Sequence, residues 1–329
     1  MLTCPTRKFA GRTSLFYRMK ERIGVIDLGT NTFHLLVAEL NDGRMSIIHR
    51  ERQAVKIGMG GINQGVIQDD AIERAVRCLQ GFKATLDLEH VVKVQALGTS
   101  ALRTATNGGA VIRAIKEKTG IEVQIISGEQ EAEYIYYGVR AAMDLGTSPA
   151  LIVDIGGGSV EFIVADRTQI HWKASYPIGA QRMLERYHRH DPILLKECDA
   201  LQAHYIESLA PLQKAMSDFR PNVLVGSSGT FDTLSEIYCR RNQLPFRSEH
   251  PETPLTVEAF REIHAELVSK DRSDRMNIPG MIEMRVDMIV VASFLIQYLV
   301  DQYSFQKIRV SSFSLKEGVL ARIMNTPSE

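Results

Sequence analysis

Two short stretches of this 329-residue chain combine an aspartate, glycines and hydroxyl side chains at a spacing that suits phosphate chemistry. The first is Asp154-Ile-Gly-Gly-Gly-Ser159, which lies between two apolar runs typical of strands. Consecutive glycines let backbone N–H groups approach an anion closely, and a carboxylate at the end of the first strand suits a metal carried by that anion. Alone, the pattern fits an ordinary hairpin equally well.

A second stretch of the same kind, Asp27-Leu-Gly-Thr-Asn31, lies early in the chain. Each stretch opens a similar succession of strands and helices, and each succession contains a strand that ends in small residues, at 98–100 and at 226–230. Two copies are too few for a solenoid, which needs three or more. We therefore expect an α/β protein with two domains that face each other across a cleft, with both hairpins directed into it.

Composition narrows the classes of partner. Hydrophobic residues make up 44% and charged residues 24% of the chain, as in ordinary soluble globular proteins, and the formal net charge is +0. This balance predicts neither DNA nor a membrane as a partner. Four scattered cysteines without a CxxC motif favour reduced thiols and a cytoplasmic location. The apolar run 286–300 is too short to span a bilayer and predicts a buried helix, packed within its domain or against a partner in a homodimer.

Candidate domain boundaries follow from the repeat. Residues 1–21 are basic and lack the apolar core of a signal peptide, which predicts a poorly ordered extension. Residues 22–146 and 147–329 would form the two domains. A polar segment with prolines, 240–254, is expected to be a connection without regular structure.

Seven stretches, taken in order, give the sequence a resemblance to a known family. It is similar to the exopolyphosphatase / guanosine pentaphosphate phosphohydrolase (Ppx/GppA) family of the actin-like phosphotransferase superfamily. The resemblance implies two actin-like (ribonuclease H-like) domains with mixed sheets facing each other across a cleft. It also implies a short form without the C-terminal helical domain of longer members, so processivity on very long polyphosphate is not expected. The stretches are GVIDLGTNTFHLLVA (24–38), LGTSALRTATN (97–107), ISGEQEAEYIYYGV (126–139), LIVDIGGGSVEFIV (151–164), YPIGAQRM (176–183), LVGSSGT (224–230) and VSSFSLKEGVL (310–320).

The resemblance also implies ligand-binding roles. Asp27 and Asp154 would hold Mg²⁺ directly or through water, because Mg²⁺ usually keeps several waters and few carboxylates. Glu161 alternates onto the same strand face as Ser159, so it either lies near that metal or is a solvated strand residue. The expected phosphate-binding residues are Gly29, Thr30, Asn31, Gly156, Gly157, Gly158 and Ser159 in the hairpins, Ser228, Gly229 and Thr230 at a strand-to-helix junction, and Arg103.

Glu131 is the expected catalytic base. The family has a carboxylate at the second residue of a Glu-Glu pair, and this chain has Gln130-Glu131 there. Ser127 and Gln130 match a capping box, which occupies Gln130 at the helix start and leaves Glu131 free to orient a water. A guanidinium grips phosphate oxygens bidentately, so Arg103 is expected to clamp the substrate.

These residues predict a Mg²⁺-dependent phosphohydrolase that removes terminal phosphate from polyphosphate, from guanosine pentaphosphate (pppGpp) or from both. Two alternatives remain open at this point, a kinase of the same superfamily and a non-catalytic sensor that binds guanosine penta- or tetraphosphate. A P-loop is excluded because no GxxxxGK[ST] motif occurs. His34 is expected to be a core histidine, and His190-Asp191 has no visible partner cluster for a metal.

Overall fold

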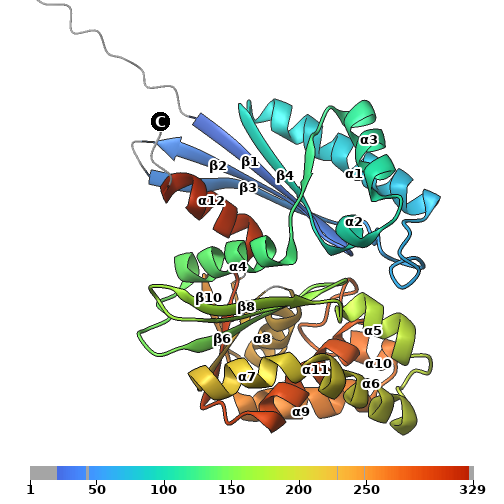
Figure 1. Cartoon of the computed structure of the whole chain (residues 1–329), viewed down its shortest axis with the longest axis vertical. Helices are drawn as coiled ribbons and strands as arrows, with labels where there is room; N and C mark the ends of the chain where they lie inside the picture. Colours follow the sequence, from blue (N-terminus) through green and yellow to red (C-terminus); the bar gives the residue numbers. More distant parts are fainter. Residues whose placement is uncertain (1–20, 42–43, 228, 248, 326–329) are drawn as a thin grey trace, which may run out of the picture.

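The protein, described here by a computed structural model, consists of two mixed sheets with helices around them (Figure 1). The structure describes residues 21–41, 44–227, 229–247 and 249–325. Residues 1–20 of the expected extension, and the expected phosphate ligand Ser228, lie outside the described residues. We refer to residues 21–125 as the first lobe and to residues 150–311 as the second lobe.

The first lobe contains a five-stranded sheet in the order β3-β2-β1-β4-β5. Strands β1 to β3 are antiparallel neighbours, whereas β4 and β5 run parallel to β1. The apolar face of α1 repeats at helical spacing and packs with α3 against this sheet. The elements are β1 (Glu21–Leu28), β2 (Thr32–Asn41), β3 (Arg44–Ala54), α1 (Asp69–Leu88), β4 (Lys93–Gly98), α2 (Ser100–Thr104), α3 (Gly108–Thr119) and β5 (Val123–Ile125).

The second lobe contains a six-stranded sheet in the order β10-β11-β9-β6-β7-β8. Apart from β10, this order repeats that of the first sheet, so the predicted internal repeat and α/β class are confirmed. The elements are β6 (Ala150–Ile155), β7 (Val160–Ala165), β8 (Ile170–Tyr176), α5 (Ala180–Tyr187), α6 (Leu195–Ser208), α7 (Ala210–Phe219), β9 (Val223–Ser227), α8 (Gly229–Arg241), β10 (Glu252–Leu255), α9 (Val257–Ser269), α10 (Arg272–Met276), α11 (Ile289–Gln302) and β11 (Lys307–Ser311).

Strand β10 corrects the prediction that segment 240–254 has no regular structure. It pairs antiparallel with β11 and lies at the sheet edge. Pro254 made a strand improbable in the sequence, but an edge strand tolerates a residue that donates no ladder hydrogen bond.

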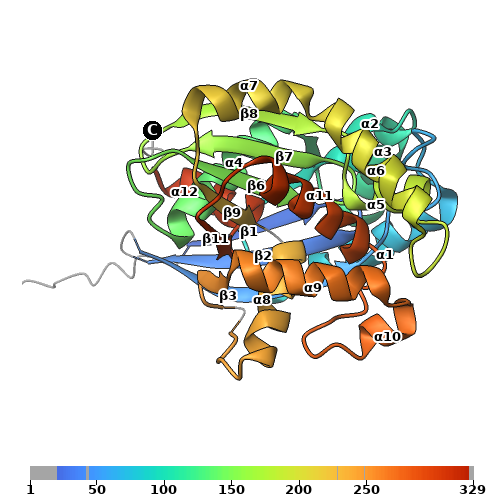
Figure 2. The same cartoon turned by 90° about the horizontal axis from the view of Figure 1, so that it is seen from below.

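Helix α11 confirms the predicted buried helix. Its side chains belong to the core of the second lobe, and it runs beside α9 (Figure 2). None of the helices in the described part of the chain combines the length and hydrophobicity that a bilayer crossing requires. The cytoplasmic location and the homodimer stay predictions.

Helices α4 (Gly128–Ala142) and α12 (Leu315–Asn325) lie between the two sheets (Figure 1). Helix α4 follows the first sheet but packs against β7 and β8 of the second, whereas α12 follows the second sheet and contacts β1 of the first. Gly138 and Gly318 lie at their crossing, where a Cβ on Gly138 would come 2.9 Å from the carbonyl carbon of Ser314. The backbones therefore approach closely, and one apolar cluster connects both lobes.

Candidate active site

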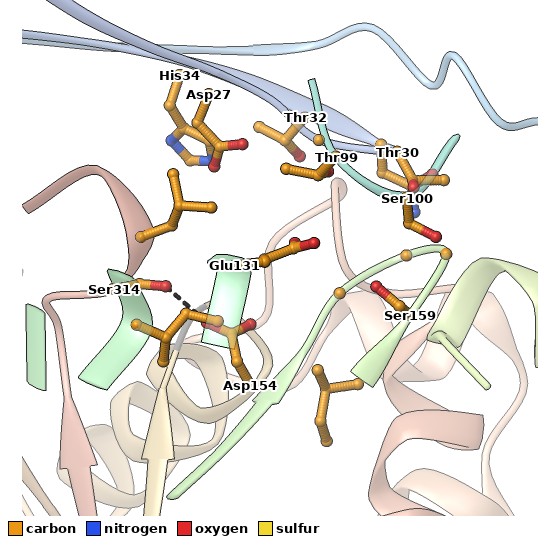
Figure 3. Close-up of a pocket in the computed structure, with 18 of the residues that line it drawn as sticks. Asp27, Thr30, Thr32, His34, Thr99, Ser100, Glu131, Asp154, Ser159 and Ser314 are labelled. Atoms are coloured by element: carbon orange, nitrogen blue, oxygen red, sulfur yellow. Dashed lines mark hydrogen bonds between the residues drawn. The ribbon is translucent and has the colours of Figure 1, made fainter. Parts of the chain in front are cut away.

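A cavity of about 80 Å³ lies between the two Asp-x-Gly hairpins (Figure 3). Ten of the predicted site residues line it, from both hairpins and from the start of α4. The structure thus brings together the residues that the repeat predicted to converge. The lining residues are Asp27, Gly29, Thr30, Asn31, Thr32, His34, Thr99, Ser100, Glu131, Ile135, Asp154, Ile155, Gly156, Gly157, Gly158, Ser159, Arg285, Ser314 and Leu315.

Helix α5 orients the glycines of the second hairpin. The Ala180 amide donates to the Gly156 carbonyl at 2.9 Å, and the Gln181 amide donates to the Gly157 carbonyl at 2.8 Å. The Arg182 guanidinium completes the set, because its Nε donates to the carbonyl of Gly158 at 2.8 Å. In a trans peptide the N–H points opposite to the C=O of the same unit. The N–H groups of residues 157–159 are therefore directed away from α5.

The first hairpin is oriented in the same way by the segment that follows β3. The Gly58 amide donates to the Thr30 carbonyl at 3.0 Å, and the Lys56 amide donates to the Asn31 carbonyl at 2.8 Å. The N–H groups of Asn31 and Thr32 consequently point away from that segment. Both lobes thus use neighbouring donors to turn hairpin amides outward, as an anion site requires.

Glycine is required in the second hairpin because the two hairpins almost touch. A Cβ at Gly157 would lie 2.9 Å from Nδ2 of Asn31, and a Cβ at Gly158 would lie 2.6 Å from Thr30 Oγ1 and from Ser100 Oγ. The sequence suggested that these glycines leave space for a ligand. Their missing side chains also allow residues of the first lobe to pack directly against the hairpin.

Glu131 enters the cavity from the first turn of α4. The predicted capping box is present: the Gln130 amide donates to Ser127 Oγ at 3.1 Å, and the Ser127 amide donates to Gln130 Oε1 at 3.0 Å. Burial raises the pKa of the Glu131 carboxyl to about 7, Arg103 acts against this rise, and Asp154 adds to it. Nη1 of Arg103 donates to Glu131 Oε2 at 2.8 Å and to the Ile126 carbonyl at 3.0 Å. Arg103 is not among the residues that line the cavity, and its expected contact with phosphate stays a prediction.

Asp27 faces the cavity from the end of β1. Burial raises the pKa of its carboxyl to about 7, with further contributions from Glu131 and Asp154, while Lys316 acts against the rise. Three carboxylates that repel one another across one cavity would be stabilised by a divalent cation. Within the described ranges, no three His, Cys, Asp or Glu side chains converge to complete a metal site alone. Mg²⁺, which keeps waters and takes substrate phosphates as ligands, fits this donor set.

Asp154 is held by hydroxyl groups at the start of α12 and the end of β9. Ser314 Oγ donates to Asp154 Oδ2 at 2.6 Å, as Figure 3 shows, and Ser227 Oγ donates to the same oxygen at 3.1 Å. Both donors fix the orientation of a carboxylate that the sequence assigned to metal binding. The Glu317 carboxylate accepts a hydrogen bond from the Ser314 backbone amide at 3.0 Å. Ser314 therefore binds Glu317 through its amide and Asp154 through its hydroxyl.

The remaining predicted residues lie outside the cavity lining. Glu161 is 1% exposed, so it is not a solvated strand residue, and its Oε1 accepts from Ser159 Oγ and Ser175 Oγ at 2.7 Å each. Gly229 lines a neighbouring cavity of about 100 Å³, and Thr230 is buried beside it at the start of α8. Their expected contact with phosphate stays a prediction.

Sequence reasoning missed several lining residues. Thr32 occupies the repeat position of Ser159, since Asp27 corresponds to Asp154, so the repeat itself could have identified it. His34 lines the cavity opposite Asp27 on the neighbouring strand; burial, with Lys316 and other cations nearby, lowers its pKa well below the usual value. It is therefore a neutral cavity residue and not only a core histidine.

Arg285 is the lining residue that carries a permanent positive charge. It belongs to the loop before α11, and no hydrogen-bond partner among the described residues occupies its buried Nε. Its guanidinium packs over Gly229, which leaves no room for a Cβ there. No periodicity or motif in the sequence singled out this loop, so only the fold reveals the residue.

Comparison with known proteins agrees with this geometry. The model of the Ppx/GppA phosphatase family matches residues 36–327. A solved structure from Cytophaga hutchinsonii, described as an exopolyphosphatase, is 42% identical, covers 93% of this chain and 98% of its own, and has a TM-score of 0.90. A Haemophilus influenzae relative with a provisional exopolyphosphatase name is 27% identical over 299 residues, 91% of this chain and 90% of its own. An Aquifex aeolicus family member, 24% identical with a TM-score of 0.77, covers 94% of this chain and 100% of its own and shares the fold. The chain belongs to the Ppx/GppA phosphatase family.

Proposed function

We propose that the protein releases terminal orthophosphate from inorganic polyphosphate, from pppGpp or from both, by attack of a water that Glu131 holds. The observation that carries the proposal is the position of Glu131: its buried carboxylate lies in a cavity between two hairpins whose amides are turned outward. A base with a pKa of about 7 is matched to work near neutral pH. The exopolyphosphatase relatives support the substrate class.

The hairpins would bind and orient the terminal phosphate. Amides of residues 157–159 and of Asn31 and Thr32 supply N–H donors, and the hydroxyls of Thr30 and Ser159 line the same cavity. Arg285 brings a guanidinium whose Nε has no partner among the described residues. Fixed donors of this kind stabilise the charge that develops on the transferring group.

The proton chemistry is assigned to Glu131. Its carboxylate accepts a proton from water while the water oxygen bonds to the terminal phosphorus and the bond to the bridging oxygen breaks. Orthophosphate leaves, and the shortened chain keeps the bridging oxygen. Arg103 keeps the carboxylate in place and favours its ionised form. Mg²⁺, held by Asp27 and Asp154 when bound, would neutralise charge on the phosphate oxygens.

Phosphate release from tripolyphosphate, long-chain polyphosphate and pppGpp, measured side by side with and without Mg²⁺, tests the proposal. We expect Mg²⁺-dependent release from at least one of them. A protein that binds these compounds but never releases phosphate would instead be a sensor, and ATP-dependent transfer to an acceptor hydroxyl would indicate a kinase.

A further inference from the structure

A basic groove lies at the end of α5, outside the cavity between the hairpins. Its volume is about 280 Å³, and it is formed by the last turn of α5, the following loop and the start of α6. We call it the α5–α6 groove. Its lining residues are Arg186, Tyr187, Arg189, His190, Lys196, Glu197 and Ala200.

The cations of this groove lack ion-pair partners in the part of the chain that the structure describes. Arg186, Arg189 and Lys196 are exposed, and none of them forms an ion pair with an acidic side chain among the described residues. Glu197, the acid in the lining, accepts from the Leu194 amide at 3.0 Å and contacts His190 Nδ1 at 2.7 Å. Because the whole chain has a net charge of +0, this surplus of positive charge is local.

Helix α5 connects the groove to the cavity. Its first turn binds the glycine hairpin through Arg182 and two amides, and its last turn supplies Arg186 and Tyr187 to the groove. The helix has eight residues, so its ends are about 10 Å apart at 1.5 Å per residue. Burial lowers the pKa of the Arg182 guanidinium, and the nearby positive charge of Arg186 adds to this effect. In both overall views, α5 and α6 lie at the same end of the molecule as α2 (Figures 1 and 2).

We propose that the α5–α6 groove binds the distal part of a linear polyphosphate whose terminal phosphate occupies the cavity. This inference rests on the proposed function. A polyanion that contacts both places gains affinity because the second contact is intramolecular, whereas tripolyphosphate is too short to bridge them. The groove would therefore favour long chains over short ones.

The test compares two double charge reversals. The variant R186E/R189E reverses two of the three exposed cations of the groove. As a matched control, R113E/K118E reverses two exposed cations of α3 that form no ion pair among the described residues. We expect the KM for long-chain polyphosphate to rise about tenfold or more in the groove variant, since each exposed charge contact contributes modestly and is reversed rather than removed. The kcat/KM for tripolyphosphate should stay within about twofold of wild type, because neither site of reversal contacts the cavity.

Salt dependence and direct binding complete the test. The KM of the wild type for long chains should rise more steeply with ionic strength than that of R186E/R189E. An unchanged KM for long chains in that variant, or an equal rise in KM in R113E/K118E, would overturn the proposal that the groove binds polyphosphate. If the wild type hydrolyses neither substrate, the proposed function fails, and anisotropy of labelled long-chain polyphosphate still tests the groove by binding. Equal binding of single-stranded RNA at the groove would reassign it to nucleic acid and reject the polyphosphate role.

Discussion

The guanidinium of Arg103 donates to the Glu131 carboxylate at 2.8 Å, and the pair connects helix α2 to helix α4. Glu131, on a helix between the two lobes, is thus held by a residue of the first lobe. Nη1 of Arg103 therefore acts on the position and ionisation of the Glu131 carboxyl. The expected role of Arg103 as a phosphate clamp stays a prediction.

Replacing Glu131 with Gln should abolish most of the activity while the fold survives. Gln keeps the shape of the side chain but accepts no proton, and loss of a general base costs about 10²- to 10⁴-fold in kcat. Initial rates of phosphate release measure the effect, with circular dichroism as the check on folding. Activity equal to wild type would exclude Glu131 as the base.

Removing Arg103 should shift the pH profile. Because Arg103 lowers the pKa of Glu131, the Arg103→Met variant should have a Glu131 pKa above about 7. The base must be ionised, so the acidic limb of kcat/KM moves to higher pH and activity at pH 6 falls more than activity at pH 9. If Arg103 acts only as a phosphate clamp, KM rises equally at both pH values and the limb does not move.

Binding of Mg²⁺ should weaken as pH falls through about 7, because the raised pKa of Asp27 keeps its carboxyl protonated below that pH. The rise in thermal midpoint on adding Mg²⁺ should therefore be larger at pH 8 than at pH 6. In Asp27→Asn the dependence on pH should flatten. The thermal midpoint needs no substrate, so the result does not depend on activity. An equal rise in thermal midpoint at both pH values would show that Asp27 does not bind the metal.

Gly158→Ala should separate the hairpins and reduce activity. The added Cβ would lie 2.6 Å from Thr30 Oγ1 and Ser100 Oγ, so at least one of these groups must move. Gly81→Ala in α1 is the control, because nothing lies within 4 Å of its Cβ and Ala stabilises a helix by about 1 kcal/mol relative to Gly. We expect a loss of kcat/KM in the first variant and a raised thermal midpoint with full activity in the second. Wild-type rates for Gly158→Ala would show that the hairpins need not approach so closely.

Asp191 should be needed for stability and not for metal binding. The two oxygens of its carboxylate accept hydrogen bonds from Nη1 and Nη2 of Arg275 at 2.8 and 3.0 Å, and Arg275 is 1% exposed. Removing the carboxylate leaves the buried Arg275 guanidinium without its counter-charge, so Asp191→Ala should lower the free energy of unfolding by about 3–5 kcal/mol. Arg261→Met breaks an exposed pair with Asp301 at 2.8 Å, and should cost at most about 1 kcal/mol. Urea unfolding compares the two variants, and equal costs would contradict this reasoning.

Local patterns in the sequence predicted most of the fold. Strand–turn–strand repeats, a capping box at Ser127 and an apolar stretch at 286–300 each specify structure through neighbours in the chain. Strand β10 and helix α2 were not predicted, because Pro254 argues against a strand and a five-residue helix has no periodicity to detect.

The site residues that the sequence could predict are those that occur at equivalent positions in the two halves of the internal repeat. Asp27 and Asp154 occupy equivalent positions, and the family resemblance added Glu131. Arg285 was not predictable, because its loop lies far from both hairpins in the sequence and is brought to the cavity only by the fold of the second lobe. The Arg103–Glu131 contact was also hidden, since both residues were recognised but their pairing depends on how α2 and α4 meet.

The position of α12 has a consequence for synthesis on the ribosome. Val319 and Leu320 belong to the same apolar cluster as Ile23 and Val25. In a nascent chain, the part of this cluster that α12 completes therefore stays open until the whole second lobe has been translated. The first half completes its apolar packing only after the second half has been made, although each has its own sheet. Chaperones that bind hydrophobic segments would find a binding site in this apolar surface before α12 covers it.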